Sequence, residues 1–99
     1  MLNITKTIEN GNAVLKPAGR LDTLTAPDME ATIKEVLPGL TSLTLDLSEL
    51  EYISSAGLRV LLLAKKAIGA GGELTVCNVN ETVMEILEVT GFSEILSVR

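Results

Sequence analysis

The feature that most constrains the fold is a change of hydrophobic period along the chain, from helical spacing to strict alternation. Apolar and polar residues alternate over residues 43–47, as in a strand with one more polar face. The apolar residues before this segment recur at the spacing of a helix, at Met29, Ile33, Val36 and Leu37. Strands that alternate with helices imply parallel strands joined by crossovers, so we expect an α/β fold.

An antiparallel hairpin is expected at the beginning of the chain. Asn10-Gly11 follows an alternating segment and can supply the positive backbone angles of a tight turn. Residues 13–19 should return as the partner strand, and Pro17, which has no backbone donor, favours an edge position or a strand end. The expected fold is a small mixed β-sheet, an N-terminal hairpin followed by parallel strands, packed with helices in one domain over residues 1–99.

Capping residues and glycines predict where the helices begin and end. Three helices are expected: from a Thr25 cap to Pro38-Gly39, from Ser54 or Ser55 to the glycines at 69–72, and from Asn80 to Gly91. Two further strands are expected over residues 74–79 and 95–98. Residues 48–53 are expected to form a loop.

The residues needed for the common catalytic systems are missing. The sequence has no histidine, which excludes Ser-His-Asp and Cys-His nucleophile systems and nearly all ordinary zinc sites. The lone cysteine, Cys77, lies in a strand-like run and has the character of a buried structural residue. The glycines at 69–72 match neither a phosphate-binding loop nor a dinucleotide fingerprint. We therefore expect a protein that is not an enzyme and needs no cofactor or metal ion.

Charge and hydropathy exclude two classes of partner. Eight basic residues against thirteen acidic ones give a net charge of −5 without a basic run, which argues against nucleic acid. No apolar stretch is long enough to cross a membrane, so no membrane insertion is expected. The beginning of the chain lacks the pattern of a secretory signal, which favours a cytoplasmic location.

Two aspartates raise a rival interpretation. Asp22 and Asp46 each follow an apolar strand-like run, and a carboxylate pair at one edge of the sheet could hold magnesium. This pattern would suit a receiver-type domain that is phosphorylated on Asp46. Such a domain also needs an acidic pair after its first strand and a lysine near the end of a late strand, and residues 8–10 and 77–79 offer neither.

The most informative segment is residues 46–58, which read DLSELEYISSAGL and lead from a strand into a helix. This segment resembles the signature of the STAS domain family, in the form found in bacterial anti-sigma factor antagonists. In that signature Asp-Leu-Ser leads to Asp-Ser-Ser/Thr/Ala-Gly-Leu, and the first serine is phosphorylated. Gly57-Leu58 fixes the register, so the resemblance makes Ser55 the phosphorylation site. Ser54 replaces the usual aspartate and is a second possible acceptor.

A second likeness lies before the first expected helix, where Gly19-Arg20-Leu21-Asp22 is similar to the family's Gly-x-Leu-Asp turn. On the second expected helix, Arg59, Leu62, Leu63 and Lys66 share one side, which would suit protein docking if it faces solvent. The alternative is that the C-terminal segment covers one of these leucines. The expected partner-binding residues are Asp22, Thr23, Ser54, Ser55, Ala56, Gly57, Arg59 and Leu62.

The resemblance implies a partner-switching regulator of transcription. The unphosphorylated domain would bind an anti-sigma factor or related serine kinase, phosphorylation of Ser55 would release that partner, and a serine phosphatase would reset the cycle. A serine before a helix is more often only a cap, but Ser54 can cap while Ser55 exposes its hydroxyl. The alternative function is a non-switching STAS subunit of a transport or scaffold complex, in which Ser55 is only a cap.

Overall fold

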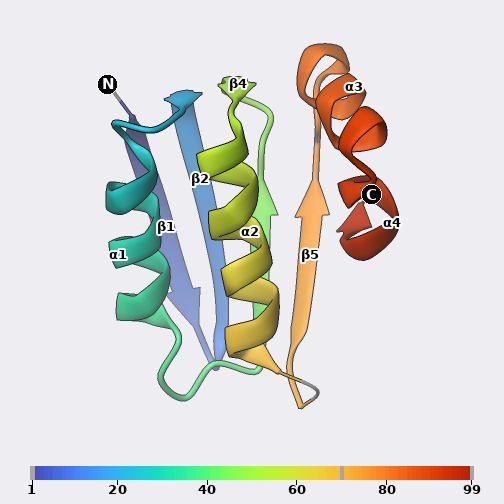
Figure 1. Ribbon diagram of the computed structural model, residues 1–99. Helices are drawn as coiled ribbons and strands as arrows, with labels where there is room; N and C mark the ends of the chain where they lie inside the picture. Colours follow the sequence, from blue (N-terminus) through green and yellow to red (C-terminus); the bar gives the residue numbers. More distant parts are fainter. Residues whose placement is uncertain (1, 70, 99) are drawn as a thin grey trace.

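A computed structural model describes residues 2–69 and 71–98 and shows a mixed α/β architecture (Figure 1). Within these residues one sheet of six strands is accompanied by four helices. The elements are, in order, β1 (Asn3–Glu9), β2 (Asn12–Leu21), α1 (Ala26–Val36), β3 (Ser42–Asp46), β4 (Leu50–Ile53), α2 (Ser55–Ile68), β5 (Glu73–Cys77), α3 (Glu81–Thr90), α4 (Phe92–Ile95) and β6 (Ser97–Val98). The expected α/β fold with a mixed sheet is confirmed.

The sheet begins with the expected hairpin. β1 pairs antiparallel with β2, and Asn10 and Gly11 at the turn have φ angles of 50° and 80°. These positive values are the ones that a two-residue turn of this type requires. The remaining pairs are parallel, and the strand order is β1-β2-β3-β5-β6, with β4 pairing on β2 as well.

β2 changes partner halfway along its length. Its first part, Asn12 to Leu15, pairs with β3, and its last part, Gly19 to Leu21, pairs with β4. Pro17 lies between these two ladders and is buried, so the expectation of an edge position or strand end is wrong. The missing backbone donor is tolerated because neither parallel ladder includes Pro17.

β4 is a second departure from expectation, because residues 50–53 lie within the predicted loop. Leu50 and Ile53 are almost fully buried, and the backbone between them completes a parallel ladder with β2. A strand of four residues with two exposed or half-exposed central positions has no clear alternation. Its partner is far away in sequence, so local pattern could not reveal it.

Two helices cover one face of the sheet. Figure 1 shows α1 and α2 side by side in front of the strands, with α3 and α4 beyond β5. The covered face carries the alternating leucines of β3, Leu43 and Leu45, which are fully buried together with Met29 and Ile33 of α1. The opposite face carries the half-buried polar residues of β3, which confirms the expected polar side of that strand.

Most helix boundaries agree with the expected capping residues. Ser54 and Asn80 accept backbone hydrogen bonds at the starts of α2 and α3, and Gly91 ends α3 with a left-handed backbone. Thr25 precedes α1 but makes no side-chain cap, which corrects the prediction. No helix in the described parts of the chain combines the length and apolar character needed to cross a membrane.

The strand ends also differ from expectation. β5 stops at Cys77, because Asn78 turns the backbone to a φ angle of 55°. The C-terminal segment forms the short helix α4 before a two-residue strand, β6, rather than a strand over residues 95–98.

Gly57 allows the first turn of α2 to lie directly against the sheet. A Cβ atom at this position would come within 2.7 Å of Ile53 Cγ1, 2.8 Å of Leu21 Cγ and 3.0 Å of the Leu21 carbonyl oxygen. Real Cβ atoms do not approach neighbours this closely, so only glycine fits without movement of the helix.

We expect Gly57→Ala to destabilise the fold by about 1–3 kcal/mol, because overpacking outweighs the roughly 1 kcal/mol that alanine gains in a helix. Urea unfolding followed by circular dichroism measures the change. Gly71→Ala is the matched control, since a Cβ at Gly71 has no neighbour within 4 Å. Equal stability of the two variants would contradict the close approach.

Candidate functional site

The residues predicted to form the site meet because β2 and β4 are parallel neighbours. Leu21 at the end of β2 is paired with Ile53 at the end of β4. The chain after each strand therefore emerges at the same edge of the sheet, where ligand sites of parallel sheets occur. The Ser54 N–H donates to the Leu21 carbonyl at 2.9 Å and ties the start of α2 to the end of β2.

Ser54 and Ser55 have different surroundings. Ser54 is half-buried with an extended backbone, and its Oγ accepts a long hydrogen bond of 3.5 Å from the Gly57 N–H. Ser55 is the first residue of α2 and is exposed. None of the hydrogen bonds found among residues 2–69 and 71–98 involves the Ser55 hydroxyl. Ser54 is thus the helix cap, as expected, and it leaves the Ser55 hydroxyl available.

Asp22 organises the loop between β2 and α1. Its Oδ1 accepts hydrogen bonds from the backbone N–H groups of Leu24, at 3.0 Å, and Thr25, at 3.2 Å. The bond from Thr25 is the main cause that holds the pKa of Asp22 below its usual value, and burial opposes this effect only in part. The loop is further closed by Thr25 Oγ1, which donates to the Arg20 carbonyl and accepts from the Asp22 N–H.

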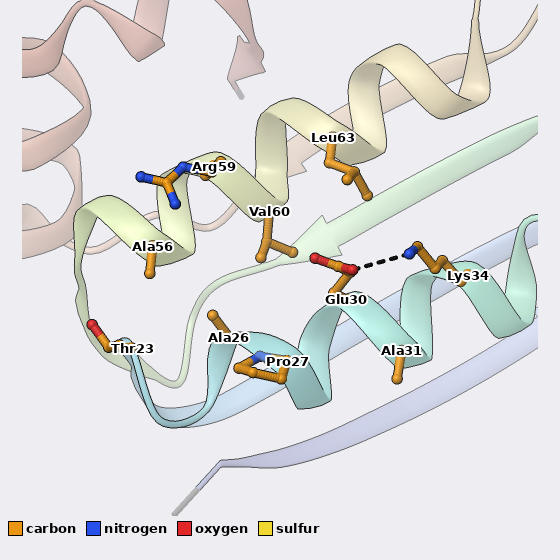
Figure 2. Close-up of a pocket in the computed structure, with 10 residues that line it drawn as sticks. All are labelled: Thr23, Ala26, Pro27, Glu30, Ala31, Lys34, Ala56, Arg59, Val60 and Leu63. Atoms are coloured by element: carbon orange, nitrogen blue, oxygen red, sulfur yellow. Dashed lines mark ion pairs between the residues drawn. The ribbon is translucent and has the colours of Figure 1, made fainter.

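A groove of about 530 Å³ runs between α1 and α2 (Figure 2), and its lining includes Ala56, the residue after the exposed Ser55. Thr23, Ala56 and Arg59 line it from the loop and from α2. The α1 side includes small residues, Ala26 and Ala31, and the ion pair between Lys34 and Glu30. We call this groove, together with the shallower one described next, the α1–α2 groove.

The second groove, of about 430 Å³, continues along α2 and is lined by Arg59, Leu62, Leu63, Lys66 and Ala67. Arg59 and Leu63 line both parts. Leu62 and Leu63 are half-buried, whereas Arg59 and Lys66 are exposed. The apolar and basic residues that share one side of the second helix therefore form a continuous surface that begins beside Ser55.

The predicted partner-binding residues do not all contribute in the same way. Thr23, Ala56, Arg59 and Leu62 line the groove, whereas Ser55 is exposed next to Ala56 and is not itself a lining residue. Asp22 is occupied with backbone N–H groups, and Ser54 caps α2. Gly57 is buried, so it serves the surface only by seating the helix.

Asp46 lies far from Asp22, which removes the expected carboxylate pair. Because Leu15 pairs with Leu45, Asp46 is level with Lys16, and Asp22 lies six residues further along the chain, just beyond the end of β2. Six residues of strand span about 20 Å, at roughly 3.3 Å each. Among the described residues, no cluster of three or more acidic or cysteine side chains could hold a metal ion. The geometry therefore gives no support to the receiver interpretation.

Asp46 and Cys77 are neighbours at the ends of β3 and β5. Burial works to raise the pKa of Asp46, but the Ser48 N–H, assisted by the side chains of Ser48 and Asn78, lowers it overall. Burial, and then the charge of Asp46, raises the pKa of the Cys77 thiol. Cys77 is half-buried rather than buried as expected. A thiol with a raised pKa is a poor nucleophile at neutral pH, which agrees with the expectation that Cys77 is not reactive.

The sequence did not reveal the contribution of α1 to this surface. Ala26, Pro27, Glu30, Ala31 and Lys34 line the groove, although they lie about 30 residues before α2 in the chain. A helix with small residues on one exposed side is the only local signal, and it does not indicate which helix lies opposite. Leu24 was also missed; this residue of the β2–α1 loop has 87% of its surface exposed.

Comparison with known proteins identifies the family. The family model described as the STAS domain matches residues 3–99. The chain belongs to the STAS domain family. The structure of an anti-sigma factor antagonist from Mycobacterium paratuberculosis superposes with a TM-score of 0.91, covering 99% of this chain and 85% of that one at 23% identity. This last similarity establishes the shared fold.

Two curated relatives extend the comparison. Over 82 residues the chain is 42% identical to BtrV of Bordetella bronchiseptica, whose provisional name is anti-sigma factor antagonist; the match covers 81% of this chain and 71% of BtrV. Over 69 residues it is 38% identical to the anti-sigma-F factor antagonist RsfB of Mycobacterium tuberculosis, covering 69% of this chain and 57% of RsfB. The chain thus spans little more than half the length of RsfB.

The lowered pKa of Asp22 predicts a pH-dependent contribution to stability. The ionised carboxylate stabilises the fold above the unfolded pKa of about 3.9, and this contribution is lost as the pH falls through the folded pKa. We expect Asp22→Asn to be less stable than the wild type at pH 7, and we expect this difference to narrow as the pH falls through the folded pKa. Urea midpoints at pH 7, 5 and 3 measure this, and a difference that does not narrow as the pH falls would contradict the role of the charge.

Proposed function

We propose that this chain is an anti-sigma factor antagonist that works by partner switching. The unphosphorylated domain binds an anti-sigma factor with serine kinase activity, and phosphorylation of Ser55 releases it. A serine phosphatase then restores the binding form. In this role the chain receives a phosphate and performs no catalysis, and it acts in the cytoplasm. The exposed hydroxyl of Ser55 beside the α1–α2 groove is the observation that carries the proposal.

Because Ser55 lies at the start of a helix, a phosphate there would be compatible with the fold but would weaken the binding of a partner. The start of a helix offers unpaired backbone N–H groups and the positive end of the helix dipole, which favour an anion. A phosphate adds about 1.5 to 2 negative charges. A desolvation or repulsion penalty of roughly 3 kcal/mol against a docked partner would reduce affinity by more than about 100-fold.

The α1–α2 groove supports the choice of a protein as partner. Its floor is apolar, and Arg59 and Lys66 are exposed cations outside the described ion pairs, whereas Lys34 is paired with Glu30. These cations belong to a chain with a net charge of −5. Half-buried Leu62 and Leu63 between these cations provide the combination of apolar area and charge found in protein interfaces. An acidic, amphipathic segment of the partner fits this surface best.

The acceptor is tested with the cognate kinase and ATP. We expect one phosphate on the wild-type chain and on Ser54→Ala, and none on Ser55→Ala, as measured by intact mass. Ser54→Ala is a demanding control because it removes the neighbouring hydroxyl and weakens the cap of α2. Phosphorylation of Ser55→Ala to the wild-type extent would refute the assignment.

The switch is tested with Ser55→Asp in a binding titration. We expect affinity for the kinase to fall by at least about tenfold, since aspartate has roughly half the charge of a phosphate. Ser55→Asn, of similar size and without charge, is the control and should bind nearly as the wild type does. Unchanged binding of Ser55→Asp would favour a non-switching scaffold or transport subunit instead.

Leu24 is expected to be an apolar anchor for the same partner. The Asp22 carboxylate fixes the loop, so the leucine is presented with little conformational freedom to lose. We expect Leu24→Ala to weaken partner binding about tenfold without loss of folding stability. Val89→Ala is the matched control, because Val89 is 81% exposed on α3, away from the groove. Equal effects of the two changes would exclude Leu24 as an anchor.

A further inference from the structure

Arg59 lies four residues after Ser55 on α2, and this spacing has a consequence for the phosphorylated state. Residues four apart on a helix lie on the same face, with Cβ atoms about 5–6 Å from each other. Both residues are exposed. Ser55 and Arg59 therefore face the same solvent at the end of the α1–α2 groove.

The side chain of Arg59 already extends in the required direction. Figure 2 shows it running back along α2 toward the first turn, on the side of Ala56, rather than toward Leu63. Side chains on a helix tilt toward its N-terminus, so this direction is the usual one for a long side chain. A phosphate on Ser55 would stand in front of the guanidinium.

Arg59 forms no ion pair with any other residue that the structure describes. Within the described residues, the ion pairs join Lys6 with Glu35, Lys16 with Glu49, and Lys34 with Glu30, and none involves Arg59. The nearby acidic groups are already occupied. Glu30, across the groove, holds Lys34 at 3.0 Å, and Asp22 accepts backbone N–H groups within its loop.

We propose that Arg59 is the internal counter-ion of a phosphate on Ser55, an inference that rests on the proposed function. A guanidinium can donate two parallel hydrogen bonds to one phosphate, a strong and directional arrangement. Phosphorylation then changes the docking surface twice. It adds a dianion beside the α1–α2 groove, and it withdraws from a partner the one arginine that lines both parts of that groove within the described chain.

The pairing is measured without any kinase. Phosphoserine is incorporated at position 55 during translation, and the second pKa of the phosphate is followed by ³¹P NMR between about pH 4 and 8. A cation at hydrogen-bond distance stabilises the dianion and lowers this pKa. We expect Arg59→Gln to raise it by about 0.5 unit, which is a roughly threefold smaller acid dissociation constant.

Lys66→Gln is the matched control, because it removes the same charge from the same groove at the other end of α2. Lys66 lies eleven residues after Ser55, about 16 Å along the helix, where salt screens most of its effect. We expect a shift of no more than about 0.1 unit for Lys66→Gln. Arg59→Lys, which keeps the charge and loses the paired donors, should give an intermediate value.

Equal phosphate pKa values in Arg59→Gln and Lys66→Gln would overturn the pairing. This outcome is distinct from failure of the proposed function, because the phosphate is installed without the kinase. If the kinase phosphorylates Ser55 but Arg59→Gln leaves the phosphate pKa unchanged, only the pairing is refuted. If the kinase does not phosphorylate Ser55 but Arg59→Gln raises the phosphate pKa, only the proposed function is refuted.

Discussion

The parallel pairing of β2 with β4 determines where the parts of the proposed site lie. It places Leu21 beside Ile53, so that the loop after β2 and the start of α2 emerge together. The pairing is possible because β2 leaves its first partner, β3, before Pro17 and gains its second, β4, at Gly19. Gly57 then lets α2 lie close to both strands. The exposed serine therefore stands on a helix start that is held against the ends of two strands.

This support explains how a single hydroxyl could control binding without a change of fold. The Ser54 backbone is fixed by Leu21, and its side chain closes the first turn of α2. Ser55 projects from that fixed turn, at the end of a groove made of apolar and basic side chains. A negative charge added there alters the surface that a partner meets, while the hydrogen bonds that define the turn stay in place. The proposed regulation is a change in surface electrostatics.

The sequence predicted those parts of the fold that depend on local chemistry. Ser54, Asn80 and Gly91 mark helix ends through their own backbone partners, and each is in its expected role. Features that depend on distant partners were missed. β4 is recognisable only from its ladder with β2, and Thr25 bonds to Arg20 and Asp22 rather than capping α1. The separation of Asp22 from Asp46 follows from strand register, which no local pattern shows.

The two sides of the α1–α2 groove come from different helices. This arrangement has a consequence for how related domains could bind different partners. The α2 wall carries Ala56 and Arg59, next to the exposed Ser55, whereas the α1 wall carries Ala26, Glu30 and Lys34. Substitutions on α1 could alter which partner fits while leaving the proposed phosphate acceptor, Ser55, untouched. Several such domains in one cell could share the same modification chemistry and still be insulated from cross-talk, because the α1 part of the groove lies on a different helix from the proposed phosphate acceptor.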